Sequence, residues 1–134
     1  MTYLVPEQRT VPHLFPESAE FGVMPKVFAT GYLVGLLEWA CMHHLTESSH
    51  LGDQQISVGT HVNVSHTAAT VAGQLVTVEV TCTRVDPRVI EWDVVARDER
   101  DLISTGTHQR AVLDRGRFAA GVERKADELG LVWG

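Results

Sequence analysis

The segment VFATGYLVGLLEWACM, residues 27–42, constrains the fold more than any other part of the chain. Apolar residues occupy nearly every position, and a helix that is apolar all round is buried. The segment carries one carboxylate, Glu38, and an ionised carboxylate is costly to bury without partners. Glu38 is either a margin residue facing solvent, a structural glutamate bonded to a strand, or a functional acid. The functional role is favoured, because buried carboxylates are often tuned acids, bases or nucleophiles.

Thr30 lies where this helix begins and is predicted to cap it. The first amides of a helix carry a partial positive charge and can hold a developing oxyanion, and Gly31 lets a substrate approach the backbone closely. Glu38 follows Thr30 by roughly 12 Å of helix, at about 1.5 Å per residue. Three explanations stay open: one of the two is not catalytic, the helix is irregular between them, or the site combines residues from two protomers.

The rest of the chain is mostly predicted to form β-strands. Val, Ile and Thr are frequent, and Val76, Val78 and Val80 alternate with polar residues. The breaks between segments are short, which predicts antiparallel meander pairing. The expected strands cover residues 56–69, 74–86, 88–99 and 101–114, and residues 117–130 are expected to form a surface helix.

One buried helix and one sheet predict an α+β fold, with an antiparallel sheet of about five strands wrapped around one long central helix. The length of 134 residues predicts a single domain, 1–134, with an N-terminal strand and lid at 1–29 and a C-terminal helix and tail at 115–134. Such a sheet covers one side of the helix. The other side and the free sheet edge are therefore expected to dock a second copy, which gives a homodimer.

Four of the five prolines lie within the first 26 residues. Proline removes a backbone donor, so little regular structure is expected there beyond a short edge strand at 3–11. Residues 12–25, PHLFPESAEFGVMP, are predicted to form an irregular loop with exposed apolar side chains. Loops of this length without structure of their own often serve as lids.

The charge and the termini exclude several classes of partner. The net charge is −6 and no run of basic residues appears, which argues against nucleic acid and anionic membranes as partners. No apolar stretch reaches the length of about 18 residues that a membrane helix needs. The N-terminus lacks the features of a signal peptide, and Cys41 and Cys82 are expected to be free thiols, so a cytoplasmic location is expected.

The histidines are weak signals on their own. His66 shares a predicted strand face with Val62 and Val64, where a histidine is more often a core residue than a catalyst. His108 precedes Arg110 on one predicted strand face. No H-x-x-x-H or C-x-x-C spacing, phosphate-binding glycine loop or G-x-S-x-G elbow occurs. No metal site is therefore expected.

Several motifs occur together in an order that points to one family. They are FATGYLVGLLEWAC, VSHTAAT and STGTHQRAV, preceded by the lid segment TVPHLFPESAEF. From about Thr10 to Phe118 the chain resembles the fluoroacetyl-CoA thioesterase family of the hotdog superfamily. The resemblance implies a hotdog fold, a dimer, and hydrolysis of an acyl-CoA thioester without a metal or other cofactor.

The resemblance also implies a set of site residues. The family's catalytic threonine, glutamate and histidine fall on Thr30, Glu38 and His66. Its glycine before the histidine falls on Gly59 and its arginine on Arg110, and both are expected to bind substrate. In the implied chemistry Thr30 or Glu38 attacks the thioester carbonyl or orients water, while His66 acts as general base and then as general acid.

The remaining implied substrate contacts are Val11, Phe21, Met24 and Phe28. Met24 departs from the fluoroacetyl-specific enzyme, which carries a phenylalanine there. Because methionine adapts to varied shapes, fluoroacetyl-CoA and related short acyl-CoA esters both stay open as substrates. A non-catalytic hotdog protein that binds acyl-CoA is the alternative function, and a hotdog dehydratase is a weaker one.

Overall fold

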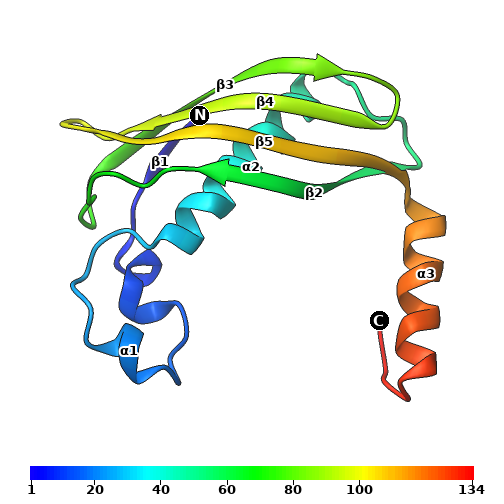
Figure 1. The fold of residues 1–134 in the computed structure, drawn as a ribbon, viewed down its shortest axis with the longest axis horizontal. Coiled ribbons are helices and arrows are strands. Elements are labelled where there is room, and N and C mark those ends of the chain that lie inside the picture. The colour runs from blue at the N-terminus through cyan, green and yellow to red at the C-terminus, as the bar shows by residue number, and fades with distance from the viewer.

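The computed structural model describes residues 1–134 and contains one long helix, α2 (Thr30–Glu47), under a curved antiparallel sheet (Figure 1). The sheet has five strands in the order β1-β3-β4-β5-β2. The predicted α+β architecture, with a sheet wrapped on one central helix, is confirmed. The strands are β1 (Thr2–Leu4), β2 (Gln55–Val64), β3 (Leu75–Val85), β4 (Val89–Arg97) and β5 (Leu102–Asp114).

The meander prediction is correct for β3, β4 and β5 and wrong for β2. Strand β2 pairs with β5, so it lies on the far side of the sheet from β3. The connection between them runs across the start of α2. Ser65 and Thr67 donate backbone hydrogen bonds to β5, and Val71 then bridges Val27. The sequence predicts a strand that continues to Ala69, whereas β2 ends at Val64 and the chain then crosses the start of α2.

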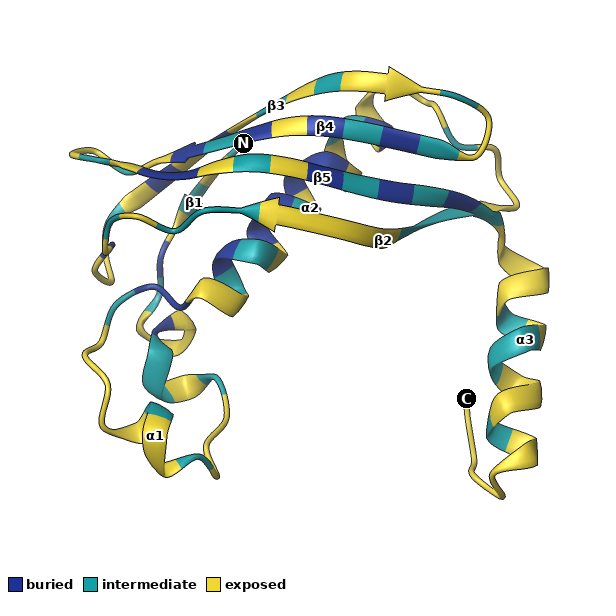
Figure 2. Ribbon diagram, viewed as in Figure 1, coloured by how far each residue is buried: buried dark blue, intermediate teal, exposed yellow.

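The core lies between the concave face of the sheet and one face of α2 (Figure 2). Successive side chains of a strand point to opposite faces, so burial alternates along β3 and β4. The opposite face of α2, which includes Trp39 and Met42, is exposed in the single chain. The helix is thus buried on one side only. Its buried residues are Leu33, Leu36, Leu37, Ala40, Cys41 and Leu45.

The N-terminal strand is shorter than predicted. Strand β1 ends at Leu4, and the expected strand at 3–11 is wrong beyond that point. Pro6 has no N–H to donate to a ladder, and the chain continues as two 3₁₀ turns, η1 (Glu7–Arg9) and η2 (Val11–His13).

The predicted lid contains one short helix, α1 (Ala19–Gly22). The Ser18 hydroxyl caps it by accepting a hydrogen bond from the Phe21 amide at 3.1 Å. The base of this segment is anchored, because the Val11 amide donates to the Val27 carbonyl at 2.9 Å. The segment therefore projects beside the start of α2 (Figure 1).

Helix α3 (Arg115–Glu128) follows β5 directly and projects from the end of the sheet opposite α1 (Figure 1). The Asp114 side chain caps it by accepting from the Arg117 amide at 2.9 Å. None of its residues is buried, so the predicted surface helix is confirmed. None of the helices has the length and apolar character that crossing a membrane requires.

Candidate functional site

Thr30 is the first residue of α2, and Ala29 occupies the cap position. No side chain caps this helix, so the predicted capping role of Thr30 is wrong. Its hydroxyl instead lies 2.7 Å from Nδ1 of His66. The first intrahelical bond runs from the Leu33 amide to the Ala29 carbonyl, so the amides of Thr30 and Gly31 precede it and have no intrahelical acceptor.

His66 lies in the connection after β2, not on a strand face as predicted. Its two neighbours fix its backbone, because the Ser65 and Thr67 amides both donate to β5 carbonyls at 2.9 Å. The imidazole is thereby held over the start of α2. This placement, and not the alternation of the strand, brings it to Thr30.

Burial lowers the pKa of His66 below its ordinary value of 6.5, although the nearby Ala68 backbone opposes the shift. The imidazole is therefore neutral at pH 7. When Nε2 carries the proton, Nδ1 accepts the hydrogen bond from the Thr30 hydroxyl. The Nε2 atom is buried and has no hydrogen-bond partner within the chain.

Glu38 projects from α2 towards the β2–β5 pair. Its Oε1 accepts a hydrogen bond from Nη1 of Arg110 at 3.2 Å. The Glu38 side chain is 37% exposed, whereas the Arg110 side chain is only 5% exposed. The predicted buried carboxylate is thus partly exposed, with a buried partner. Gly59 leaves room for it, because a Cβ at Gly59 would lie 2.5 Å from Oε1.

Arg110 is held by three further contacts. Its Nε and Nη2 donate to the Ser57 hydroxyl and carbonyl at 2.8 and 3.0 Å, and its Nη1 lies 3.3 Å from Nε2 of His108. His108 Nδ1 donates to the His61 carbonyl at 2.9 Å, which leaves Nε2 as an acceptor. Burial, with Arg110 adding to it, lowers the pKa of His108 and keeps it neutral. These contacts orient Arg110 towards Glu38.

The Thr30–His66 pair and the Glu38–Arg110 pair are separate within one chain. Each pair has its own short contact, and no hydrogen bond or ion pair joins the two. Helix α2 is continuous from Thr30 to Glu47, so an irregular helix does not explain their separation. Neither pair lines any of five cavities that measure about 180 to 660 Å³.

The four residues expected to contact the acyl group differ in burial within the single chain. Val11 and Phe21 are half-buried in the lid, and Met24 is 48% exposed there. Phe28 is buried in the core, where its ring lies 6.2 Å from that of Tyr3. Phe28 is therefore a core residue, whereas the other three side chains are at least partly exposed.

Leu14 is a lid residue that the sequence did not single out. A Cβ at Gly31 would lie 3.1 Å from Cδ2 of Leu14, so Leu14 packs directly on the start of α2 beside Thr30. Its only signal in the sequence was that it is an apolar residue within the lid.

The chain has no group of three or more His, Cys, Asp or Glu side chains arranged to hold a metal ion.

Comparisons with known proteins identify the family and the fold. The profile of the FlK family, described as fluoroacetyl-CoA-specific thioesterase, matches residues 9–116. The fluoroacetyl-CoA thioesterase of Streptantibioticus cattleyicolor is 46% identical over 123 residues, which cover 92% of this chain and 87% of that protein.

Solved structures extend the match. A mutant of the fluoroacetyl-CoA-specific thioesterase FlK in complex with fluoroacetate and CoA superposes with a TM-score of 0.89, at 45% identity, over 93% of this chain and 96% of the other. A hot-dog-like protein from Thermanaerovibrio acidaminovorans superposes with a TM-score of 0.77, at 22% identity, over 93% and 87% of the two chains, which bears on the fold alone. The predicted hotdog fold is therefore confirmed. The chain belongs to the fluoroacetyl-CoA-specific thioesterase family and is itself a thioesterase.

Proposed function

We propose that the protein hydrolyses a small acyl-CoA thioester to the free acid and CoA, with Thr30 and His66 as the attacking pair. The 2.7 Å contact between the Thr30 hydroxyl and Nδ1 of His66 carries this proposal. A neutral imidazole that accepts a hydroxyl hydrogen bond is placed to take that proton as the oxygen attacks. The 46% identical fluoroacetyl-CoA thioesterase supports the substrate class.

In the proposed first half-reaction, Oγ1 of Thr30 bonds to the thioester carbon while His66 takes the hydroxyl proton. Negative charge develops on the carbonyl oxygen, and the free amides at the start of α2 supply donors and a partial positive charge beside Thr30. The carbon–sulfur bond then breaks. His66 returns its proton to the departing thiolate, which leaves an acyl ester on Thr30 and free CoA.

In the second half-reaction water cleaves the acyl ester, and Glu38 supports this deacylation. His66 takes a proton from the attacking water and passes it to Oγ1 of Thr30 as the ester bond breaks. Arg110 holds Oε1 of Glu38, so the other carboxylate oxygen is left to orient the water. Arg110 and Gly59 thus act in this proposal by positioning Glu38. Direct attack by oriented water, without an acyl ester on Thr30, is the competing course.

We propose a homodimer in which each site draws on both chains. Strand β2 is an edge strand that pairs on one side only, and the outer face of α2 is exposed. Within one chain Glu38 bonds Arg110 and His66 bonds Thr30, so Glu38 is not bonded to His66 in its own chain. A second copy docked along β2 supplies Glu38 of the partner subunit to the Thr30–His66 pair.

We further propose that residues 1–134 act as one domain in the cytoplasm, with no nucleic-acid or membrane partner and no cofactor beyond the CoA ester. The net charge of −6 supports the choice of partners. Cys41 and Cys82 are free, and burial raises the pKa of Cys41 to about 12, so that thiol stays protonated.

The acyl group is proposed to be fluoroacetyl or a related short acyl chain, bound under the lid by Val11, Phe21 and Met24, with Phe28 supporting the lid from the core. Met24 is a flexible side chain at the lid surface. A flexible thioether accepts several small groups, which supports a range of short acyl chains.

Thiol release measured over a panel of acyl-CoA esters, with fluoroacetyl and acetyl included, tests the proposal. The wild-type protein is expected to hydrolyse the short esters, and Thr30→Ala, Glu38→Gln and His66→Ala are each expected to slow turnover strongly. Near-normal rates in all three variants contradict the assigned site. Mass spectrometry of the Glu38→Gln variant mixed with substrate distinguishes the two mechanisms. An acyl adduct on the peptide that contains Thr30 supports the covalent mechanism over direct attack by water.

A further inference from the structure

A groove of about 660 Å³ lies between α3 and the adjoining end of the sheet. This volume is typical of small-molecule sites, which measure about 300–1,000 Å³. Its floor is apolar, and Gly121 also lines the groove. The family profile ends at residue 116, near the start of α3. The apolar floor consists of Val112 and Leu113 from β5 and of Phe118 and Val122 from α3.

Three cationic side chains, Arg88, Arg117 and Lys125, line this groove, with Asp114 the one acidic residue among its lining residues. None of the three cations forms an ion pair or a side-chain hydrogen bond. Four of the eleven Lys and Arg side chains pair with a carboxylate, and none of these four lines the groove. Three unpaired cations around one groove are notable in a chain whose net charge is −6, and they create a local anion-binding surface.

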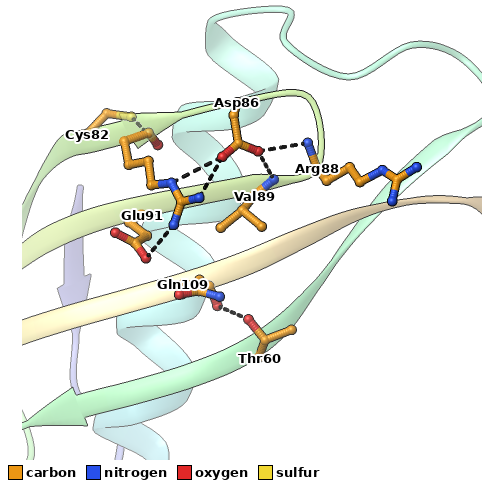
Figure 3. A network of polar contacts seen from close by, with 8 residues as sticks. Thr60, Cys82, Asp86, Arg88, Val89, Glu91 and Gln109 are labelled. Carbon is orange, nitrogen blue, oxygen red and sulfur yellow. Dashed lines mark hydrogen bonds and ion pairs between the residues drawn. The ribbon is translucent and has the colours of Figure 1, made fainter.

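Arg88 is held at the groove by the turn between β3 and β4. Asp86 accepts hydrogen bonds from the Arg88 and Val89 amides at 3.1 and 2.9 Å, and the Arg88 carbonyl accepts from the Val112 amide at 2.8 Å. Figure 3 shows the Arg88 side chain extending away from Asp86, with no dashed line at its guanidinium group. The turn therefore fixes the backbone of Arg88 and leaves its charge free.

Cations around an apolar floor suit a ligand that combines phosphate groups with a flat heteroaromatic ring. Phosphates bind Arg and Lys through charge-assisted hydrogen bonds, and a purine ring packs on apolar and aromatic side chains such as Phe118. The proposed substrate has this composition at the end remote from its thioester, where an adenosine carries a 3′-phosphate and a 5′-diphosphate.

We propose that the α3 groove binds the phosphorylated adenosine end of the acyl-CoA substrate, and that the groove of one protomer serves the Thr30–His66 pair of the other. This inference rests on the proposed acyl-CoA hydrolysis and on the proposed dimer. The groove sets the affinity for the CoA ester, while the chemistry stays at Thr30 and His66.

The topology explains why the groove acts across the dimer. Within one chain the lid and α3 lie at opposite ends of the sheet (Figure 1). Strand β2 ends at Val64, next to His66, and begins at Gln55, which pairs with Asp114 at the start of α3. If two copies pair antiparallel along their free β2 edges, the His66 end of one strand lies beside the Gln55 end of the other. The groove of one chain then adjoins the catalytic pair of its partner.

The first test compares two substrates of different length. Arg88→Gln, Arg117→Gln and Lys125→Gln, singly and together, are assayed with an acyl-CoA and with the same acyl group on pantetheine, which lacks the adenosine and its phosphates. Each substitution is expected to raise KM for the CoA ester about 3- to 10-fold, with kcat and the pantetheine ester unaffected. Arg97→Gln, which removes an unpaired exposed cation at the other end of β4, is the matched control.

Two outcomes of this assay overturn the inference. One is an equal change in KM for both substrates, or a KM effect from Arg97→Gln in place of the groove variants. The other is that the groove variants lose the dimer, as measured by light scattering, while KM changes equally for the two substrates. The groove would then hold the partner's lid and not a nucleotide.

The second test separates the groove from the hydrolysis. Calorimetric binding of adenosine 3′,5′-bisphosphate, which has no thioester, is expected for the wild-type protein and is expected to weaken at least 10-fold in the triple variant. If no acyl-CoA is hydrolysed but this binding and its loss are observed, the proposed function fails and the groove stands. If hydrolysis occurs and the bisphosphate binds the triple variant equally well, the groove inference fails and the function stands.

Mixed dimers test which protomer's groove is used. A His66→Gln chain is co-expressed with a chain that carries the three groove substitutions, and the mixed dimer is isolated by two affinity tags. If the groove acts across the dimer, one site has an intact His66 and an intact groove, so a wild-type KM returns at about half the wild-type kcat. A KM that stays raised means that each groove serves its own chain, which overturns the proposed arrangement.

Discussion

The Thr30 hydroxyl lies 2.7 Å from Nδ1 of His66, although 36 residues separate the two along the chain. Thr30 is fixed by the first turn of α2, and His66 is fixed by the backbone bonds of Ser65 and Thr67 to β5. The contact thus exists because α2 packs on the sheet that contains β5. A mechanism in which these two residues act as a unit has measurable consequences.

Removing either member of the pair is expected to abolish most turnover. Thr30→Val and His66→Gln should each lower kcat by about 10²- to 10⁴-fold, the usual contribution of a positioned acid–base group. The double variant should be no slower than the slower single one, because residues that act as a unit are not additive. Thr30→Ser keeps the hydroxyl and is the control. Independent, multiplying effects in steady-state kinetics contradict the pairing.

The activity is expected to fall on the acid side with a midpoint below pH 6.5. Burial lowers the pKa of His66, so the imidazole stays neutral, and able to take a proton, to a lower pH than a free histidine. A pH profile of kcat/KM measures this midpoint. A midpoint above 6.5 is incompatible with the burial-driven shift.

The stability is expected to fall over the same range. His66 and His108 both have pKa values lowered by burial, so the native state binds fewer protons than the unfolded state near and below pH 6.5. The free energy of unfolding therefore decreases as pH drops from about 6.5 through the lowered values. Urea unfolding at several pH values measures the slope, which should be shallower in His108→Gln. An unchanged slope in that variant removes His108 as a cause.

Gly59→Ala is expected to lower activity through Glu38. The new Cβ would lie 2.5 Å from Oε1 of Glu38, so the carboxylate must leave Arg110 or the strand must shift. Turnover should fall at least 10-fold if deacylation depends on the oriented carboxylate. Gly52→Ala is the control, because its Cβ would make only ordinary contacts, with Gln55. Equal activity in both variants means that the Glu38 position is not used.

Arg110→Met is expected to destabilise the fold more than Arg84→Met. Arg110 is buried and hydrogen-bonds Glu38 and Ser57, and losing these contacts should cost about 1–3 kcal/mol. Arg84 pairs with carboxylates at the surface, where such pairs are worth about 0–1 kcal/mol. Thermal or urea unfolding compares the two. An equal loss in both shows that burial of Arg110 does not matter for stability.

Met24→Phe is expected to narrow the choice of acyl group. An aromatic ring in the lid is more rigid than the thioether of methionine, and a change of one group in a small pocket alters discrimination by about 1–3 kcal/mol. The ratio of kcat/KM for fluoroacetyl-CoA to that for acetyl-CoA should rise. Val23→Phe places the same ring at a side chain that is 84% exposed and should leave the ratio unchanged. A ratio that moves equally in both variants indicates a general effect of lid bulk.

The α+β architecture was predictable because periodicity is a local property. Alternation along β3 and β4 indicates which residues face the core, and the apolar run in α2 indicates a core helix. The place of β2 was not predictable, because alternation identifies a face of a strand and not its neighbour. Its pairing with β5 depends on the crossing connection, in which Val71 bridges Val27.

The sequence by itself determined that one apolar helix packs under one antiparallel sheet. It also determined that Thr30, Glu38 and His66 lie in the motifs of a thioesterase family. Both conclusions are local, because periodicity and short motifs depend only on residues that are close in the sequence. Only the tertiary structure decided the contacts among them. It brought His66 to Thr30 and Arg110 to Glu38, since both contacts require α2 and β5 to share one core. It also showed that the Thr30 hydroxyl does not cap α2, because Ala29 occupies the cap position one residue earlier.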